Sequence, residues 1–217
     1  MAYQGDTLKH QGMRNHLVEQ LKLKGITDTV VLKAISKVPR HLFLDSSFED
    51  YAYQDKAFPI AANQTISQPY TVAFQSQHLQ CEPGFKVLEV GTGSGYQAAV
   101  LLEMGCKVFT IERQSELFHS TSILLKRLNY RPTMSFGDGY KGMPAYAPFD
   151  RAIVTAAAPQ IPNALLEQLK IGGKLIIPIG ETSASQRMFL VTKTGPRSAD
   201  RLDLGTFRFV PMLENRE

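Results

Sequence analysis

The sequence of 217 residues is poor in cysteine and has no long apolar run, and each absence excludes a class of protein. Its two cysteines, Cys81 and Cys106, are too far apart for a CxxC pair and have no metal-ligand spacing. We therefore expect them to be reduced packing residues, as in cytosolic proteins. No stretch approaches the roughly 18 consecutive apolar residues of a membrane-spanning helix, so no membrane partner is predicted.

Targeting and strong charge are also missing. Residues 1–7 lack the basic and then apolar pattern of a secretory signal peptide, which predicts a cytoplasmic location. The net charge of +4 and the isoelectric point near 9.0 would tolerate a nucleic-acid partner. However, the charges are dispersed, and no segment is as basic as a nucleic-acid-binding arm. No metal site is predicted either, because metal-ligand spacing is missing among the five histidines: His10, His16, His41, His78 and His119.

What is present is the composition of an ordinary globular protein, with 43% hydrophobic and 20% charged residues. Residues 8–23 have apolar side chains at helical spacing, and Asp28 is placed to cap a second helix that ends before Pro39. Between Pro39 and Pro83 the periodicity is poor. This stretch is predicted to be a long irregular segment, which in a compact domain is more often functional than idle.

After Pro83, strand-like and helix-like runs alternate. Strands are predicted at 87–90, 108–111, 133–136, 152–155, 174–177, 188–192 and 207–210. Helices are predicted at 97–104, 115–128 and 161–169. This alternation predicts an α/β fold with a Rossmann-like, doubly wound, mostly parallel seven-stranded sheet, closed by an antiparallel hairpin.

A glycine turn follows the first of these strands, at Gly91, Gly93 and Gly95. A strand, a glycine turn and a helix together make a nucleotide-sized crevice in such folds. A dinucleotide is disfavoured, because its fingerprint needs a glycine at the sixth position, which is Tyr96 here. Glu89 would also repel a pyrophosphate. S-adenosylmethionine, which carries a sulfonium and an ammonium group and no phosphate, suits an acid at this place.

Acids also follow the next two strands. Glu112 is placed to accept hydrogen bonds from ribose hydroxyls, and Asp138 to meet an adenine amino group, whereas the fourth strand ends in small residues from Thr155. Each acid alone could instead be a helix cap or a solvated residue. Three acids at successive strand ends, with the glycine turn, favour an adenosine ligand without phosphates, as in class I methyltransferases.

The acceptor is less clear from the residues. The Asn/Asp-Pro-Pro-Tyr motif of enzymes that methylate amide or base nitrogens is replaced by TAAAP at 155–159. A carboxylate acceptor would need no general base, because it is ionised at neutral pH. The loop 64–70 (QTISQPY) could hold a carboxylate by hydrogen bonds. It could also be a polar turn, or a helix cap before Pro69.

The chain resembles the protein-L-isoaspartate O-methyltransferase family over nearly its whole length after residue 36. The segments that carry the resemblance are 38–43, 64–70, 87–99, 110–113, 137–139, 148–150, 154–159, 165–170 and 209–211. The resemblance implies a protein-repair enzyme. Such an enzyme moves a methyl group from S-adenosyl-L-methionine to the α-carboxylate of L-isoaspartyl residues in damaged proteins and peptides, and leaves S-adenosyl-L-homocysteine. It also implies a monomer without a nucleic-acid partner.

By the same resemblance, Ser67 is the catalytic residue, a hydrogen-bonding positioner of the acceptor carboxylate. The residues expected to bind the cofactor are Gln64, Thr65, Ile66, Glu89, Gly91, Thr92, Gly93, Ser94, Gly95, Glu112, Arg113, Asp138, Gly139 and Thr155. Residues 1–83 are expected to form N-terminal helices and a substrate-side segment packed on a cofactor-binding domain at 84–217.

The chain departs from the family pattern at three places: Asn63 replaces a glycine, residues 75–77 (QSQ) replace Met-Thr-Glu, and Met143 replaces a tryptophan. These differences concern fine substrate contacts. Two other interpretations are a nucleic-acid methyltransferase, which the cofactor motifs alone would allow, and a binding module that has lost turnover. The loop around Ser67 counts against the first, and its retention beside the strand-end acids counts against the second.

Overall fold

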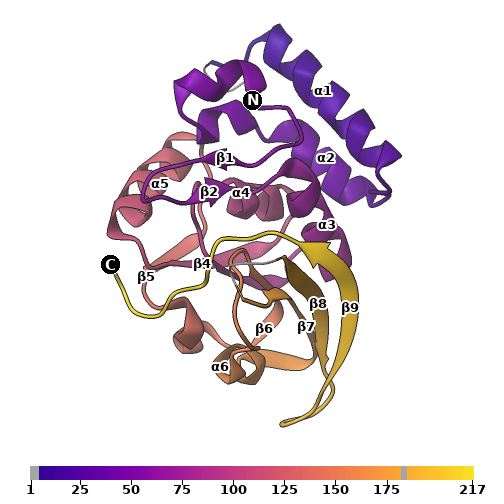
Figure 1. Cartoon of the computed structure of the whole chain (residues 1–217), viewed down its shortest axis with the longest axis vertical. Helices are drawn as coiled ribbons and strands as arrows, with labels where there is room; N and C mark the ends of the chain where they lie inside the picture. Colours follow the sequence, from indigo (N-terminus) through magenta and orange to yellow (C-terminus); the bar gives the residue numbers. More distant parts are fainter. Residues whose placement is uncertain (1–4, 182–184) are drawn as a thin grey trace.

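A computed structural model describes residues 5–181 and 185–217 (Figure 1). The helices are α1 (Leu8–Leu23), α2 (Thr29–Lys37), α3 (Pro69–Leu79), α4 (Tyr96–Glu103), α5 (Ser115–Arg127) and α6 (Asn163–Glu167). Short 3₁₀ helices are η1 (Arg40–Phe43), η2 (Ser46–Tyr51), η3 (Gly139–Lys141) and η4 (Pro144–Tyr146). The strands are β1 (Phe58–Pro59), β2 (Thr65–Ile66), β3 (Lys86–Val90), β4 (Lys107–Glu112), β5 (Thr133–Phe136), β6 (Phe149–Val154), β7 (Leu169–Ile179), β8 (Gln186–Lys193) and β9 (Ala199–Phe207).

Within these residues, a sheet of seven strands runs in the order β5-β4-β3-β6-β7-β8-β9. The strands from β5 to β7 pair in parallel, and β8 and β9 pair antiparallel to close the sheet. The predicted fold class is therefore confirmed, including the antiparallel hairpin. Strand β3 pairs with β4 on one side and with β6 on the other, so the strand order reverses beside it. This is the switch point at which such sheets bind ligands.

The sheet is buried on both faces, as alternating side chains show. Val87 belongs to one apolar cluster and its neighbour Leu88 to the other. Ile153 and Ala152 on β6 divide in the same way. The first cluster includes residues of α1–α4, and the second includes Leu165 of α6. Because side chains alternate along a strand, strands covered on both faces read as continuous apolar runs, which is why the sequence revealed them.

The predicted elements differ from the observed ones in three places. Helix α3 lies inside the segment predicted to be irregular, because its buried side carries polar residues and its apolar periodicity is weak. The strand predicted at 207–210 is wrong: β9 ends at Phe207, and its exposed, charged residues gave no apolar pattern. The helix predicted at 161–169 is shorter, because the chain enters β7 at Leu169.

The N-terminal helices pack tightly onto the sheet half. Arg40 is fully buried, donates to the carbonyl of Ala52 (2.9 Å) and lies 4.8 Å from the ring centroid of Tyr96. Burial lowers the pKa of this guanidinium to about 10. The first apolar cluster spans both segments of the predicted division at residue 83, since Leu17 packs in it together with Val87. The division itself stays a prediction. None of the described helices is long and apolar enough to cross a membrane.

Candidate active site

A pocket lies over the carboxyl ends of β3, β4 and β6. Of the residues predicted for the site, it is lined by Gln64, Thr65, Ile66, Ser67, Gly91, Thr92, Gly93, Ser94, Glu112, Arg113, Gly139 and Thr155. It is also lined by residues absent from that prediction: Val72, Val90, Tyr96, Gln97, Ile111, Gln114, Ala156, Val210, Pro211, Met212 and Leu213. The structure therefore brings together the glycine turn, the end of β4 and the loop around Ser67.

The glycine turn is fixed by a close contact between Gly91 and Thr155. Thr155 Oγ1 donates to the carbonyl oxygens of Gly91 (2.7 Å) and Val90 (3.1 Å). Gly91 has φ +95°, and a Cβ there would lie 2.5 Å from Thr155 Oγ1. Only glycine satisfies both the backbone conformation and the space, so this position explains the first glycine of the motif.

Glu112 ties the end of β4 to the same turn. Its carboxylate accepts from the backbone N–H groups of Gly93 (2.8 Å), Arg113 (2.9 Å) and Gln114 (2.9 Å). A carboxylate has about four acceptor positions, so about one remains for a ligand hydroxyl. The N–H of Gly93 is already used by this acid. A phosphate group would have to compete for it, which agrees with a ligand that carries no phosphate.

The loop around Ser67 is held by Asp55, a residue that the sequence analysis did not identify. Thr65 and Ile66 pair with β1 as a short antiparallel ladder. Asp55 then accepts from the backbone N–H of Tyr70 (2.7 Å) in the first turn of α3 and from the side-chain amide of Gln68 (3.0 Å). This carboxylate is 7% exposed and also pairs with Lys24. A lone acid far from the motif gave no signal in the sequence.

The polar loop 64–70 therefore both leads into a helix and lines the pocket. Gln68 is the residue before α3, and Pro69 occupies its first turn, as a helix-cap interpretation requires. Ser67, one residue earlier, lines the pocket. Among the described residues it has no hydrogen-bond partner, so its hydroxyl is available to a ligand. Asn63, which stands where the family has a glycine, has φ +53°, a left-handed conformation that asparagine tolerates better than most residues.

The C-terminal segment closes one wall of the pocket. The N–H of Ala157 donates to the carbonyl of Val210 (2.8 Å), and the N–H of Met212 donates to the carbonyl of Ala157 (2.7 Å). In Figure 1 this segment continues from β9 across the strand ends towards α5. The side chain of Arg113 binds it further along, at the carbonyl of Asn215 (3.0 Å) and the carboxylate of Glu217 (2.9 Å).

Glu89, Gly95 and Asp138 do not line the pocket. Asp138 caps η3 by accepting from the N–H of Tyr140 (2.9 Å), which is the alternative role considered for it. Gly95 has φ +84° and precedes α4, where a Cβ would lie 2.8 Å from Thr121 Cγ2. Direct contacts of these three residues with the cofactor stay a prediction.

Glu89 is fully buried beneath the turn, and neither carboxylate oxygen has a hydrogen bond among the described residues. The strand alternation puts it on the face of Val87, beside Thr110 of the neighbouring strand, whose hydroxyl is 2.6 Å from that of Thr92. Burial raises the pKa of Glu89 to about 8; the hydroxyl of Thr110 opposes the rise, and the nearby charge of Glu112 adds to it. Burial therefore favours the protonated form of Glu89.

At the remaining departures from the family pattern, the side chains are buried or bind other parts of the chain. Gln75 is fully buried and donates to the carbonyl of Val154 (3.1 Å). Gln77 Oε1 accepts from the N–H groups of Thr27 (2.7 Å) and Asp28 (2.9 Å) at the start of α2. Met143 is 4% exposed. These positions secure the scaffold behind the pocket.

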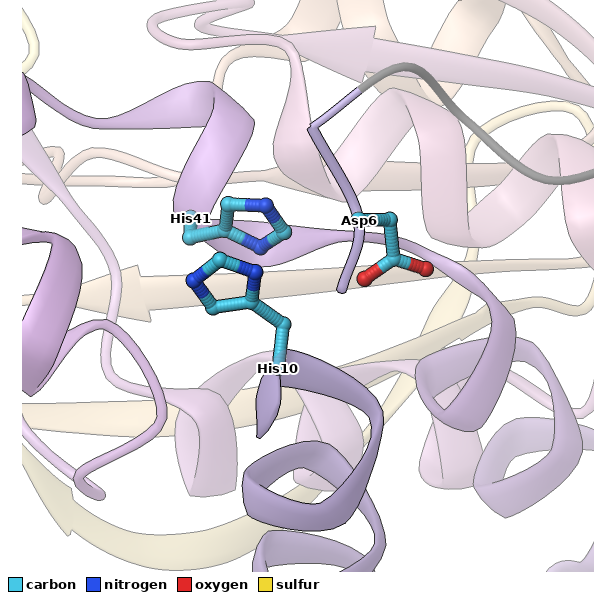
Figure 2. A group of neighbouring side chains, drawn as sticks. All are labelled: Asp6, His10 and His41. Carbon is cyan, nitrogen blue, oxygen red and sulfur yellow. The ribbon is translucent and has the colours of Figure 1, made fainter. Parts of the chain in front are cut away.

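A separate cluster, which the sequence did not indicate, joins Asp6, His10 and His41 within 4.8 Å (Figure 2). The imidazole rings stack at 3.8 Å with an angle of 15°, so their lone pairs lie in nearly parallel planes and do not converge on one ion. Asp6 is held by both terminal nitrogens of Arg14 (2.9 and 3.0 Å), and His41 Nδ1 is 2.7 Å from the hydroxyl of Tyr53. The geometry favours a hydrogen-bonded clasp at the start of α1 over a metal centre.

A model of the protein-L-isoaspartate(D-aspartate) O-methyltransferase family matches residues 12–217. The chain belongs to this family. A protein-L-isoaspartate O-methyltransferase from Flavobacterium johnsoniae is 62% identical over 97% of this chain and 99% of its own length. One from Christiangramia forsetii is 60% identical with the same coverage. The resemblance drawn from the sequence motifs is confirmed.

Solved structures agree with this family. One protein-L-isoaspartate O-methyltransferase superposes with a TM-score of 0.85 at 30% identity, over 93% of this chain and 66% of that one. Another, from Plasmodium falciparum, has a TM-score of 0.77 at 27% identity, over 95% and 99% of the two chains. The latter was solved in complex with S-adenosyl-L-homocysteine.

The contact between Gly91 and Thr155 can be tested by a Gly91→Ala variant. We expect a roughly tenfold loss of affinity for S-adenosylhomocysteine in titration calorimetry, because the new methyl group displaces Thr155 from the pocket wall. Gly84→Ala is the matched control: its φ of +87° imposes similar backbone strain, but its Cβ would meet nothing within 4 Å. Equal affinities of the two variants would contradict the steric explanation.

An Asp55→Ala variant tests the support of the loop. It removes a helix cap and the hold on Gln68, so we expect the free energy of unfolding to fall by about 1–2 kcal/mol in urea. Methyl transfer is expected to fall further than cofactor affinity. Asp45→Ala, which removes a similar cap from η2, should lower stability alone. A parallel loss of transfer in both variants would argue against a specific role of Asp55.

Glu89 predicts a pH dependence of stability. Its pKa rises from an ordinary value of 4.5 to about 8 in the folded chain, so folding favours the protonated form. The stabilisation is therefore complete below about pH 4.5 and is lost as the pH rises through 8. Glu89→Gln keeps the shape without the charge. In thermal unfolding from pH 5 to 9, we expect this variant to gain stability over the parent chain as the pH rises; a constant difference would refute the assignment.

Proposed function

We propose that this chain is a protein-repair methyltransferase that moves a methyl group from S-adenosyl-L-methionine to the α-carboxylate of L-isoaspartyl residues in damaged proteins and peptides. The observation that carries the proposal is the meeting of Ser67 with the glycine turn and Glu112 in one pocket. Membership of the family supports the same reaction. A nucleic-acid methyltransferase is disfavoured, because small residues from Thr155 onward replace the motif that orients a planar amino group.

The residues of the pocket suit this cofactor. Glu112 keeps about one acceptor position for a ribose hydroxyl, and the walls at Ile111 and Met212 are apolar, as an adenine ring requires. When bound, the sulfonium of S-adenosylmethionine supplies an electrophilic methyl group. Gly91–Gly93 can approach a ligand closely because they present backbone only on that side. Thr92, Ser94, Arg113 and Gly139 complete the proposed cofactor contacts, together with Gln64, Thr65 and Ile66.

The chemistry asks little of the protein beyond positioning. An isoaspartyl α-carboxylate is already a nucleophile at neutral pH, so no general base is needed. Ser67, with its free hydroxyl, is placed to donate a hydrogen bond that directs one carboxylate oxygen towards the methyl carbon. The C-terminal wall at residues 210–213 restricts water in the same space. Transfer in such a site is accelerated mainly by orientation.

Three finer points belong to the same proposal. The enzyme acts as a monomer, since a peptide substrate has to reach Ser67 from open surface. It works in the cytoplasm, where reduced cysteines are usual, and Cys81 and Cys106 are both free. Residues 1–83 supply the substrate side and residues 84–217 the cofactor side.

A Ser67→Ala variant tests the role of the hydroxyl. We expect turnover of an isoaspartyl peptide to fall roughly 10- to 100-fold, the effect of losing one hydrogen bond to a charged group. Affinity for S-adenosylhomocysteine should stay nearly constant in calorimetry. Ser120→Ala on the surface of α5 is the control and should leave turnover unaltered. Unchanged turnover in the Ser67 variant would remove this residue from the mechanism.

The reaction itself is tested with labelled S-adenosylmethionine offered to an isoaspartyl peptide, its normal aspartyl twin and RNA. Base-labile label on the isoaspartyl peptide alone is the expected result. Label on RNA alone, or on no substrate, would overturn the proposed function.

A further inference from the structure

A second depression opens directly from the pocket, and we name it the side groove. It shares four lining residues with the pocket: Thr65, Ser67, Thr155 and Val210. The two spaces therefore meet at the proposed acceptor position. One wall comes from the start of α3 and the other from the end of β9 and the residues after it. In Figure 1 these two elements lie on the same side of the molecule.

Substrate chemistry requires such a space. In an isoaspartyl residue the peptide chain continues through the β-carbonyl, and the α-carboxylate is a branch. When that branch reaches Ser67, the chain on both sides of it has to leave across the adjoining surface. The side groove is the surface that adjoins Ser67, so neighbouring residues of the substrate will lie in it. This step rests on the proposed function.

The walls of the side groove are aromatic. Phe74 on α3 and Phe207 at the end of β9 have ring centroids 4.8 Å apart, and Tyr70 lies 5.8 Å from Phe74. All three side chains are half-buried and line the groove, so each ring keeps an open part. Aromatic side chains packed against such rings gain about 0.5–1.5 kcal/mol beyond the area that they bury.

The charge at the described lining of the side groove is positive. Among its described lining residues, the sole charged one is Arg208, which is exposed and has no ion pair within residues 5–181 and 185–217. Lys24 approaches the ring of Tyr70 at 5.9 Å, but its ammonium is paired with Asp55. A substrate side chain entering the groove therefore meets an unopposed guanidinium.

We propose that the side groove selects isoaspartyl sites by the residue beside them: Phe74 and Phe207 bind an aromatic neighbour, and Arg208 favours an anionic neighbour over a cationic one. The enzyme thus repairs some damage sites faster than others, although the carboxylate that it methylates is the same in all of them.

The test uses peptides that differ in one residue next to the isoaspartyl group, on the amino side in one series and on the carboxyl side in another. The residue is Phe, Gly, Glu or Lys. We expect kcat/KM for the Phe peptide to exceed that for the Gly peptide by about fivefold in at least one series. We expect Glu to exceed Lys by about fivefold at low salt, and by less at high salt because surface charges are screened.

Variants assign the preference to its residues. Phe74→Leu, which keeps an apolar side chain against the core, should bring the Phe/Gly ratio close to one. Tyr146→Ala, an aromatic residue that lines neither space, is its control and should keep the ratio. Arg208→Glu should invert the Glu/Lys ratio, whereas Arg201→Glu, an exposed arginine of β9 outside the groove, should keep it. Ratios within one variant are independent of any general loss of stability.

The outcomes separate this proposal from the proposed function. If none of the peptides is methylated, the function is wrong. If all are methylated with equal kcat/KM in both series, the function holds and the proposal for the side groove is overturned. The proposal is overturned in the same way if preferences exist but survive both Phe74→Leu and Arg208→Glu.

Discussion

The pocket depends on the close packing of Gly91 against Thr155. This contact joins the ends of β3 and β6, the two neighbouring strands between which the order of the sheet reverses. A glycine allows the turn its positive φ and leaves room for the threonine hydroxyl, which binds two carbonyl groups of the turn. Thr155 then lines both the pocket and the side groove. This contact therefore lies where the proposed cofactor space and the proposed acceptor space meet.

The proposed acceptor side is assembled from segments that are remote in the sequence. Asp55 fixes the loop that presents Ser67, and the C-terminal residues close the opposite wall by pairing with Ala157. The first support requires one side chain, because the carboxylate of Asp55 accepts from the backbone N–H of Tyr70. The second uses backbone hydrogen bonds alone, which hold a segment without requiring any particular side chain. The glycine turn belongs to a rigid parallel sheet. In the proposed site, the substrate therefore contacts loops that are held by hydrogen bonds, and the cofactor contacts mainly the strand ends of the sheet.

The sequence predicted the sheet well, because each strand that is buried on both faces reads as an apolar run. It also predicted the glycine turn and Glu112, because they directly follow two of these strands and the topology of the sheet brings the strand ends together. It failed for α3, whose buried face carries Gln75 and Ser76, and for Asp55, which acts across a gap in sequence that no periodicity reveals. The wall at residues 210–213 was missed because a single bridge between Pro211 and Ala157 joins it to the sheet, and one bridge is too short to leave an apolar pattern in the sequence.

Glu112 and Glu89 both lie beside the glycine turn, but their surroundings give them different roles. Glu112 accepts three backbone N–H groups, so its negative charge is supported at the pocket wall. Glu89 lies two residues before the turn but is fully buried, and burial raises its pKa to about 8 against the opposing effect of the Thr110 hydroxyl. A second full negative charge under the turn would repel an incoming carboxylate substrate. The protonated form of Glu89 leaves one supported charge, that of Glu112, for the proposed cationic cofactor and does not oppose the proposed anionic acceptor.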